Sequence, residues 1–406
     1  MNRRSLLVLM VALALLSSGC IPIANPQFDA RYHAKRTPTH AVFAQWRYTP
    51  YVNPPFTDSA TQLTIVEIAR PSRVVTLGLE DASAVSDVMV VGGRPRVLVA
   101  EAGRIAEVDL LSRRVSVVAS GPTSLRTSAL GAAYAPDGAL VSWYETVPGL
   151  GFTVHRRLGP LEQSASVSFF ELFQSLVPLG EWRPRWQWSA REMMLLAADD
   201  YAAYLVDADA LPWGQDLPRT TVWRADFASG KVAEFAVGGA HYWPLPLAPA
   251  GYSHAGRALR RYGVPVEPMR GEVAFLSLSG GVRAVSTLPT YPAEVVVQPG
   301  GERYLAIRYP GTILAGSFGH TSTVTLLERA PAQGSAFIGL RPLGMLGDTL
   351  AYSAPAETAV PPYPPGRSAA IELRFLDTRT HRDSLVATTP VAFGAQRFDF
   401  LGSYAR

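Results

Sequence analysis

Short strands joined by tight turns recur along almost the whole chain, and this recurrence limits the possible fold more than any other feature. Residues 291–308 read YPAEVVVQPGGERYLAIR, in which two alternating apolar runs flank a Pro-Gly-Gly turn. Glycine supplies the positive φ that tight turns between twisted strands require. The same pattern recurs at residues 88–101 and 133–145. A chain built in this way is predicted to be all-β.

Longer hairpins are expected at seven places, and their turn centres lie roughly 40 to 70 residues apart, near the length of one propeller blade. They span residues 64–77, 105–118, 152–169, 221–237, 272–288, 323–340 and 371–387. Most follow another strand–turn–strand segment, at residues 88–101, 133–145, 186–199, 295–308 and 340–353. Two hairpins make one blade, so the sequence predicts a single β-propeller of seven four-stranded blades over residues 42–406. A pair of β-sandwiches is the alternative.

The two ends of this region are expected to pair with each other. Residues 396–404, QRFDFLGSY, read as a strand that no hairpin follows. Residues 42–48, VFAQWRY, read as a strand with no partner before it. Pairing the two within one blade would remove an exposed sheet edge and close the ring.

Several turns resemble those of known propellers. Residues 135–138 (APDG) and 298–301 (QPGG) resemble the turns of periplasmic Tol-type and WD-like propellers. Residues 226–231 (DFASGK) resemble the Asp-x-x-Thr-Gly-Lys turn of quinoprotein-like propellers, with Ser229 in place of the usual Thr. Asp226, and Asp109 and Asp377 at matching places in their own hairpins, are expected to cap these turns by accepting hydrogen bonds from backbone amides.

The beginning of the chain, MNRRSLLVLMVALALLSSGC, resembles a bacterial lipoprotein signal. Its apolar run at residues 6–16 is too short to span a bilayer comfortably. Small residues precede Cys20, the only cysteine, although Ser17 stands where this family usually has Leu. The resemblance implies a signal peptide of residues 1–19 and lipidation of Cys20 with acyl chains such as palmitate. An ordinary secretory leader or an uncleaved anchor is the alternative.

Lipidation would place the protein in the cell envelope. Ile21 rather than Asp follows Cys20, and this resemblance implies the outer membrane where the source has one. Residues 20–41 show no periodicity and are predicted to be a flexible tether. The formal net charge is +4, and removing Arg3 and Arg4 leaves 4 − 2 = +2. That balance is too even for an electrostatic nucleic-acid partner.

Three segments interrupt the strand pattern. Residues 166–179, SVSFFELFQSLVPL, carry phenylalanines at helical spacing and predict one short inserted amphipathic helix. This helix could cover an open blade edge or dock on a partner or membrane. Residues 244–268 and 353–368 are Pro-rich loops, which we expect at the rim of one face.

Sequence motifs for catalysis are absent from the chain. It has no Gly-x-Ser-x-Gly elbow, no His-Glu-x-x-His and no phosphate-binding Gly-rich loop. Assigning Cys20 to the lipid also removes thiol chemistry and cysteine metal sites. We therefore expect no catalytic residue, no metal site and no cofactor, a quinone included.

One cluster of carboxylates could still carry chemistry. Asp199, Asp200, Asp207 and Asp209 lie within DDYAAYLVDAD. Paired carboxylates can serve acid–base hydrolysis or hold Ca²⁺. The spacing fails for a calcium loop because Leu211 stands where a third oxygen ligand is needed. Solvated turn residues are the alternative interpretation.

Aromatic and arginine side chains form the candidate binding residues. The segment EWRPRWQW sets Trp182 beside Arg183 and Arg185, and stacked Arg–Trp layers could bind a sugar, a protein or the lipid interface. Its later tryptophans could instead pack in the core. Further candidates stand elsewhere in the sequence: His241, Trp243, Arg260, Arg261 and Tyr363.

The sequence therefore predicts a lipid-anchored propeller that binds or scaffolds an envelope protein partner, since hot spots need aromatic and arginine anchors rather than titrating groups. A propeller hydrolase acting on glycans or esters, and a carbohydrate-binding propeller, are the alternatives. A membrane contact is expected through the N-terminal lipid. The sequence leaves the oligomeric state open.

Overall fold

The computed structural model describes residues 37–47, 59–82, 84–86, 88–91, 93–101, 104–120, 129–134, 139–147, 151–168, 193–198, 201–207, 222–235, 243–244, 264–267, 272–276, 282–287, 292–297, 303–308, 311–317, 320, 322–329, 340–356, 370–389 and 396–406.

Antiparallel sheets follow one another along the chain. The first contains β29 (Gln396–Tyr404), β1 (His40–Arg47), β2 (Ser59–Glu67) and β3 (Val74–Ala82), in that order. In the second, β4 (Ala84–Val85) and β5 (Met89–Val91) both pair with β6 (Arg94–Glu101), which is followed by β7 (Arg104–Asp109) and β8 (Arg114–Ser120).

An eight-stranded sheet comes next. One half contains β9 (Ala129–Tyr134), β10 (Leu140–Val147), β11 (Gly151–Leu158) and β12 (Leu161–Ser168). The other half contains β13 (Met193–Ala198), β14 (Ala202–Asp207), β15 (Val222–Asp226) and β16 (Lys231–Phe235). The two halves meet where β12 pairs with β16.

Three four-stranded sheets complete the chain. They are β17 (Trp243–Pro244), β18 (Val264–Glu267), β19 (Glu272–Leu276) and β20 (Val282–Thr287); β21 (Pro292–Val297), β22 (Arg303–Arg308), β23 (Thr312–Ser317) and β24 (Thr323–Glu328); and β25 (Arg341–Leu346), β26 (Thr349–Pro355), β27 (Ile371–Asp377) and β28 (Asp383–Thr388).

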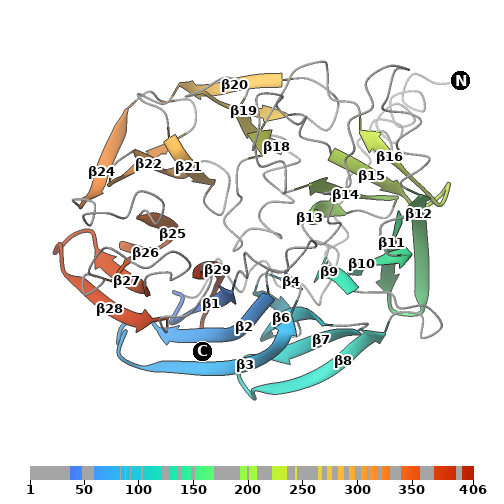
Figure 1. Cartoon of the computed structure of the whole chain (residues 1–406), viewed down its shortest axis with the longest axis horizontal. Helices are drawn as coiled ribbons and strands as arrows, with labels where there is room; N and C mark the ends of the chain where they lie inside the picture. The colour runs from blue at the N-terminus through green and yellow to red at the C-terminus, as the bar shows by residue number, and fades with distance from the viewer. Residues whose placement is uncertain are drawn as a thin grey trace, which may run out of the picture.

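The sheets stand around a common centre in chain order, with β29 and β1 near the centre and β3, β8 and β28 on the outside (Figure 1). This is the arrangement of a β-propeller, and it confirms the all-β prediction. The described residues contain no helix. In that part of the chain, accordingly, no helix has the length and apolar character to cross a membrane. The first three residues of the predicted inserted helix, 166–168, belong to β12 instead, and its remainder lies outside the described residues.

Most of the expected hairpins are present, but two were placed wrongly. The hairpin expected at residues 323–340 is formed by β23 and β24, so Thr323 begins its second strand. The start of β23 is buried at three successive residues, and a strand covered on both faces shows no alternation in its sequence. Similarly, the run MMLLAA of β13, expected to be the second strand of a hairpin over residues 186–199, pairs forward with β14, and residues 186–188 lie outside the described residues.

The ends of the chain close the ring, as the sequence predicts. β1 pairs with β29 along its whole length, from His40 opposite Tyr404 to Arg47 opposite Gln396. Beyond the strands, the Thr39 amide donates to the Tyr404 carbonyl at 2.9 Å. β1 begins at His40, two residues before the boundary expected from the sequence.

Alternate side chains of β1 pack against the sheets on both sides. Phe43 is fully buried, and its ring centre lies 5.3 Å from that of Phe400 and 6.0 Å from that of Phe375 in β27. Val42 and Ala44 point the other way, into the core formed with β6 and β7. Because successive side chains of a strand face opposite sides, one strand joins the cores of three neighbouring sheets.

Three outer turns share one construction, and it is the one expected for Asp109, Asp226 and Asp377. Oδ1 of each aspartate accepts hydrogen bonds from the amides two and three residues later, at 2.9–3.0 Å. The residue four places after each aspartate has positive φ: 58° at Arg113, 69° at Gly230 and 55° at His381. The predicted caps are therefore confirmed. In two of these turns a residue other than glycine, Arg113 or His381, has a backbone conformation that favours glycine.

We predict that replacing either of these two side chains with glycine stabilises the fold. Arg113→Gly and His381→Gly should each raise the free energy of unfolding by about 0.5–1 kcal/mol, because the left-handed conformation costs L-residues about 1–2 kcal/mol and part of the gain is lost to the more flexible unfolded chain. Gly230→Ala should lower it by about 1 kcal/mol. Denaturant unfolding measures all three.

Gly78→Ala is the matched control. An added Cβ at Gly78 meets nothing within 4 Å and its φ is not positive, whereas at Gly230 the closest atom is 3.7 Å away. Neither position is crowded, so any difference between these two variants reports backbone conformation. Equal effects would contradict the prediction.

Candidate functional site

Most residues singled out from the sequence lie outside the described residues. These are Cys20, Trp182, Arg183, Arg185, Asp199, Asp200, Asp209, His241, Arg260, Arg261 and Tyr363. Trp243 begins β17 and Asp207 ends β14. For these two the structure gives the position in a strand.

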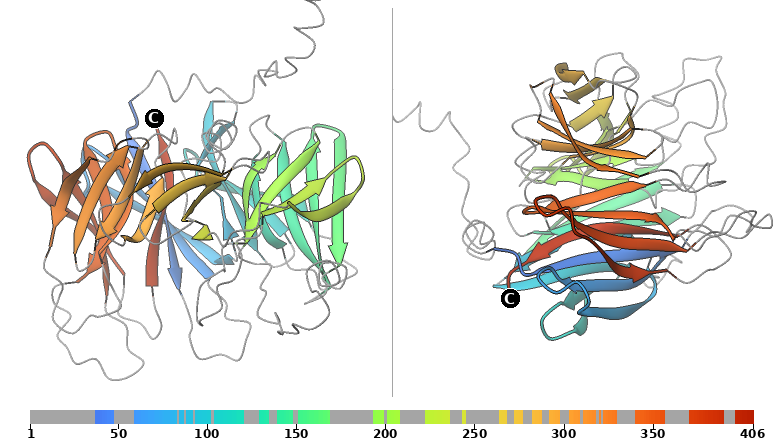
Figure 2. Two further views of the ribbon diagram at one scale, coloured as in Figure 1. Left: turned by 90° about the horizontal axis from the view of Figure 1, so that it is seen from above. Right: turned by 90° about the vertical axis from the view of Figure 1, so that its left-hand side faces the viewer.

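Strand direction divides the ring into two faces. At one face, His40 of β1 pairs with Tyr404 and with Glu67, so both ends of the folded chain and the β2–β3 turn lie together. Because neighbouring strands alternate in direction, the other third-to-fourth-strand turns lie at this face too; Figure 2 shows the β27–β28 turn on the same side as the C terminus. We call this the turn face and the opposite one the connection face.

Longer segments join strand ends at the connection face. Residues 48–58 join β1 to β2, residues 169–192 join β12 to β13, residues 208–221 join β14 to β15, and residues 357–369 join β26 to β27. The segments with Trp182 and Tyr363 therefore both start and end at this face. The segment with Arg260 and Arg261 joins β17 to β18 and starts and ends at the turn face.

The predicted carboxylate cluster is described at one residue only. Asp207 is the last residue of β14, whereas Asp199, Asp200 and Asp209 lie outside the described residues. A hydrolase built on this cluster therefore stays a prediction. Among the residues that the structure describes, no group of acidic, histidine or cysteine side chains could hold a metal ion.

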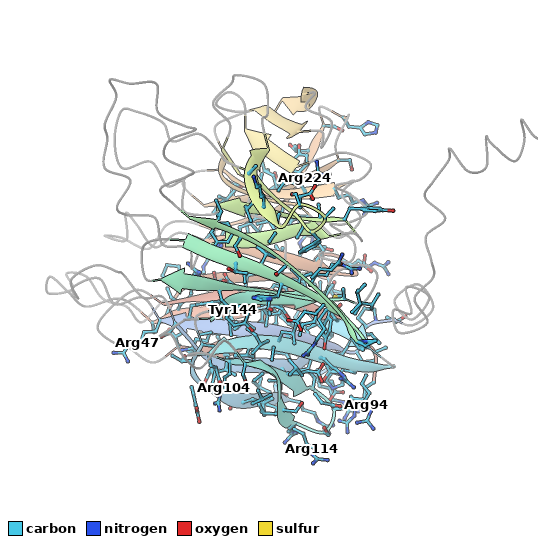
Figure 3. The ribbon with its side chains drawn as sticks, turned by 90° about the vertical axis from the view of Figure 1, so that its right-hand side faces the viewer. Arg47, Arg94, Arg104, Arg114, Tyr144 and Arg224 are labelled. Carbon is cyan, nitrogen blue, oxygen red and sulfur yellow. The ribbon has the colours of Figure 1, made fainter. Side chains whose placement is uncertain are left out.

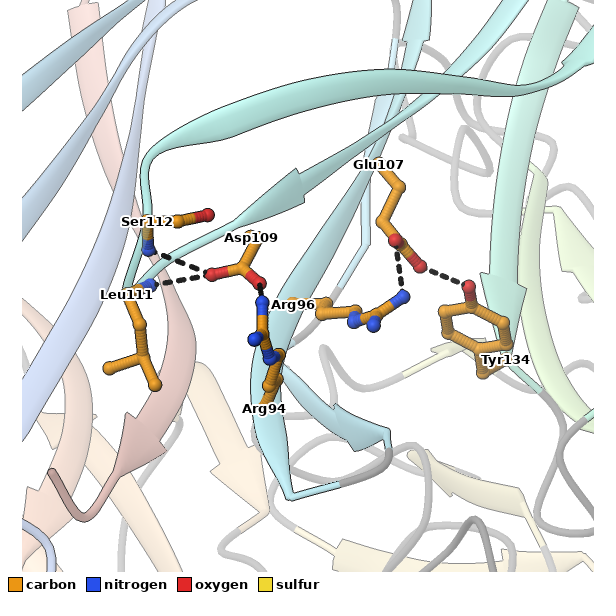
Figure 4. A network of polar contacts seen from close by, with 7 residues as sticks. All are labelled: Arg94, Arg96, Glu107, Asp109, Leu111, Ser112 and Tyr134. Atoms are coloured by element: carbon orange, nitrogen blue, oxygen red, sulfur yellow. Dashed lines mark hydrogen bonds and ion pairs between the residues drawn. The ribbon is translucent and has the colours of Figure 1, made fainter.

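Two carboxylates of the second sheet make structural hydrogen bonds: Asp109 binds the turn between β7 and β8, and Glu107 binds the neighbouring strand β9 (Figure 4). Asp109, besides capping its turn, receives Arg94 Nη1 on its second oxygen at 3.1 Å. Burial alone would raise the pKa of Asp109, but the bonds from Ser112 and Arg94 outweigh it and lower the pKa. Asp109 therefore stays ionised and structural.

A second chain of bonds joins two sheets. The guanidinium of Arg96 in β6 donates to Glu107 Oε1, and the hydroxyl of Tyr134 in β9 donates to Glu107 Oε2, each at 2.5 Å. Burial first, and then the bond to Glu107, raise the pKa of Tyr134. The phenol therefore remains a donor, and the arrangement ties the second sheet to β9 rather than activating a group for chemistry.

The closing sheet carries a corresponding tie. Arg341 of β25 donates to Asp399 of β29 at 3.0 Å, and Arg397 bonds the other oxygen at 3.3 Å. Burial would raise the pKa of Asp399, but the charges of Arg397 and Arg341 lower it. Arg397 also stacks over Trp46, 5.2 Å from the ring centre. A partly buried carboxylate is thus satisfied by two guanidinium groups, that of Arg397 on its own strand and that of Arg341 across the seam between sheets.

The residues missed from the sequence are the arginines of the turn face. Exposed arginines stand in three turn regions of neighbouring sheets: Arg70, Arg73, Arg113, Arg114, Arg379 and Arg382. The signal was present, since arginines recur two to five places after a capping aspartate or in the matching turn of β2 and β3. Only the ring arrangement shows that they share a face with the chain ends.

Comparisons with known proteins found similarity at a low level. No protein-family model and no curated protein matches the chain. Among solved structures, one described as TolB from Agrobacterium tumefaciens is 11% identical, with a TM-score of 0.36, covering 72% of this chain and 96% of that one. The β-propeller domain of Cps50 (Swd1) from Myceliophteria thermophila is 13% identical, with a TM-score of 0.40, covering 74% and 89%. The fold described above rests on the strand pairing of the chain itself.

We predict that Tyr134→Phe lowers the free energy of unfolding by about 1.5–3 kcal/mol, the worth of a hydrogen bond to a charged group. The variant keeps the ring and removes only the donor to Glu107. Tyr201→Phe is the control, since Tyr201 is 71% exposed and should change stability by less than about 0.5 kcal/mol. Equal losses in both variants, measured by denaturant unfolding, would contradict a tie between sheets.

Proposed function

We propose that this protein is an exported lipoprotein, tethered to the cell envelope through Cys20, whose seven-bladed propeller binds a protein partner. The blade number is supported by the eight-stranded sheet, in which two antiparallel four-stranded halves meet at the single parallel residue pair Ser166–Lys231. Counting each half as one blade gives two blades there, and the other five sheets give one each. The short helix belongs, in this proposal, to the segment between β12 and β13.

The observation that carries the proposal is how the described carboxylates are used. Those of Asp109, Asp226 and Asp377 accept turn amides, and those of Glu107 and Asp399 hold neighbouring sheets. Such groups give a rigid frame and leave none poised for acid–base chemistry. A rigid ring that carries long segments on one face suits recognition, because binding residues are commonly held on loops by a rigid scaffold.

The binding surface is assigned to the connection face. Trp182 and Tyr363 belong to segments that leave this face, and aromatic anchors in such positions commonly dominate binding energy. Arg260 and Arg261 leave from the other face and belong to a different surface. Both chain ends also lie on that other face, so a tether to the membrane leaves the connection face open to a partner.

The lipid anchor predicts that Cys20→Ser abolishes acylation. Cells grown with radiolabelled palmitate should label the wild-type protein and not the variant, because the chain has no other cysteine and several acyl chains are needed for stable anchoring. Ser18→Ala is the control, since a small residue is kept beside the cleavage site. Label that persists in Cys20→Ser would exclude the lipoprotein.

The binding function predicts loss of one specific partner on truncation of the aromatic residues. Crosslinking in intact cells, followed by mass spectrometry, should recover a protein with the wild type, and Trp182→Ala combined with Tyr363→Ala should reduce its yield at least ten-fold. Tyr201→Ala, an exposed tyrosine at the turn face, should leave the yield unchanged. Competition by a soluble glycan with no protein recovered would indicate a carbohydrate-binding propeller instead.

A further inference from the structure

The turn face carries three exposed arginines that form no ion pair with a described carboxylate. On this face, the nearby acidic side chains are engaged: Glu67 pairs with Arg70 and Arg73, Asp109 with Arg94, Asp348 with Arg379 at 2.8 Å, and Asp383, the residue after Arg382, with Arg374 at 3.0 Å. Asp226 and Asp377 accept turn amides. Arg113, Arg114 and Arg382 are exposed, and the structure gives them no ion pair with any described carboxylate.

These three arginines surround the place where the chain enters and leaves the ring. Arg113 lies in the turn before β8, Arg114 is the first residue of β8, and Arg382 directly precedes β28. Their sheets flank the closing sheet on its two sides. Thr39 and Arg406 lie between them and contact each other, with the Arg406 amide donating to the Thr39 hydroxyl at 2.9 Å. These three arginines therefore surround the attachment point of the tether.

The length of the tether brings this face close to the anchor. From Cys20 to the first described residue there are 37 − 20 = 17 residues. A coil of that length spans about 25 Å and a fully extended chain about 60 Å. Electrostatic attraction to a membrane acts within about 10 Å. A face held on so short a tether samples this range, whereas the connection face stands on the far side of the ring.

We propose that the turn face docks on the anionic phospholipid headgroups of the membrane that carries the anchor, through Arg113, Arg114 and Arg382. The occupant follows from the charge of the face and from its position at the tether. Each guanidinium near an anionic surface strengthens binding about five-fold. This inference rests on the proposed lipid anchor, which sets how the ring is oriented on the membrane. With the turn face on the membrane, the connection face points away from it, toward soluble partners.

The test uses the unlipidated mature chain, residues 20–406 with Cys20→Ser, which keeps every described strand. Binding is measured by co-sedimentation with vesicles of phosphatidylcholine alone or with roughly a third phosphatidylglycerol, at about 0.1 M salt. We expect at least ten-fold tighter binding to the anionic vesicles, lost when the salt is raised to about 0.5 M. The triple variant Arg113→Asn, Arg114→Gln, Arg382→Gln should weaken it roughly 100-fold.

A matched pair of single variants separates this face from total charge. Arg114→Gln should weaken binding about five-fold, whereas Arg47→Gln should change it less than about two-fold. Arg47 is also exposed but ends β1 at the connection face, on the opposite side from Arg94 (Figure 3). All these substitutions are at exposed positions, so unchanged thermal unfolding confirms that the fold is intact.

Three results would overturn the proposal: equal binding to neutral and anionic vesicles, equal effects of Arg47→Gln and Arg114→Gln, or binding of soluble polyglutamate without binding of vesicles. The last would assign the face to an acidic protein. The chain used in the vesicle assay carries no lipid. A negative vesicle result would therefore overturn the docking proposal alone, while palmitate labelling and partner capture test the proposed function separately.

Discussion

The pairing of β29 with β1 is the contact on which the rest of the structure depends. It joins residues more than three hundred places apart in the sequence, and the closure entropy of so long a loop must be met by the contacts that it makes. Those contacts are the pairing from His40 to Arg47, with one register shift between Val42 and Phe43, and the aromatic packing of Phe43 with Phe400 and Phe375. Closure covers the inner edge of β1, where another chain could otherwise pair.

Polar groups then fix what the hydrophobic core leaves undefined. The apolar cores between sheets favour burial without direction, so neighbouring sheets could slide. The bonds of Glu107 to Tyr134, and of Asp399 to Arg341, join atoms of adjacent sheets at defined positions. At the rim, the capping aspartates fix the outer turns. The same few residue types, Asp, Glu, Arg and Tyr, therefore build a frame that does no chemistry.

The two faces of the ring differ because of strand direction alone. The first described residue, the last residue and the short outer turns are all at one face, while most of the longer segments, other than residues 245–263, start and end at the other. This asymmetry gives each proposal its own face. In those proposals the tether and the basic turns contact the membrane on one side, and the segments that carry Trp182 and Tyr363 bind a partner on the other.

Local patterns in the sequence were enough to predict most strands, the short turns, the aspartate caps and the pairing of the chain ends, because alternation and turn chemistry are local properties. They placed the hairpin of β23 and β24 wrongly, since β23 is buried at three successive residues and a strand covered on both faces has no alternation to detect. The ring itself shows which polar groups of distant segments meet, such as Glu107 with Tyr134 and Asp399 with Arg341. Those relations depend on how the sheets are set around the ring, which no local pattern encodes.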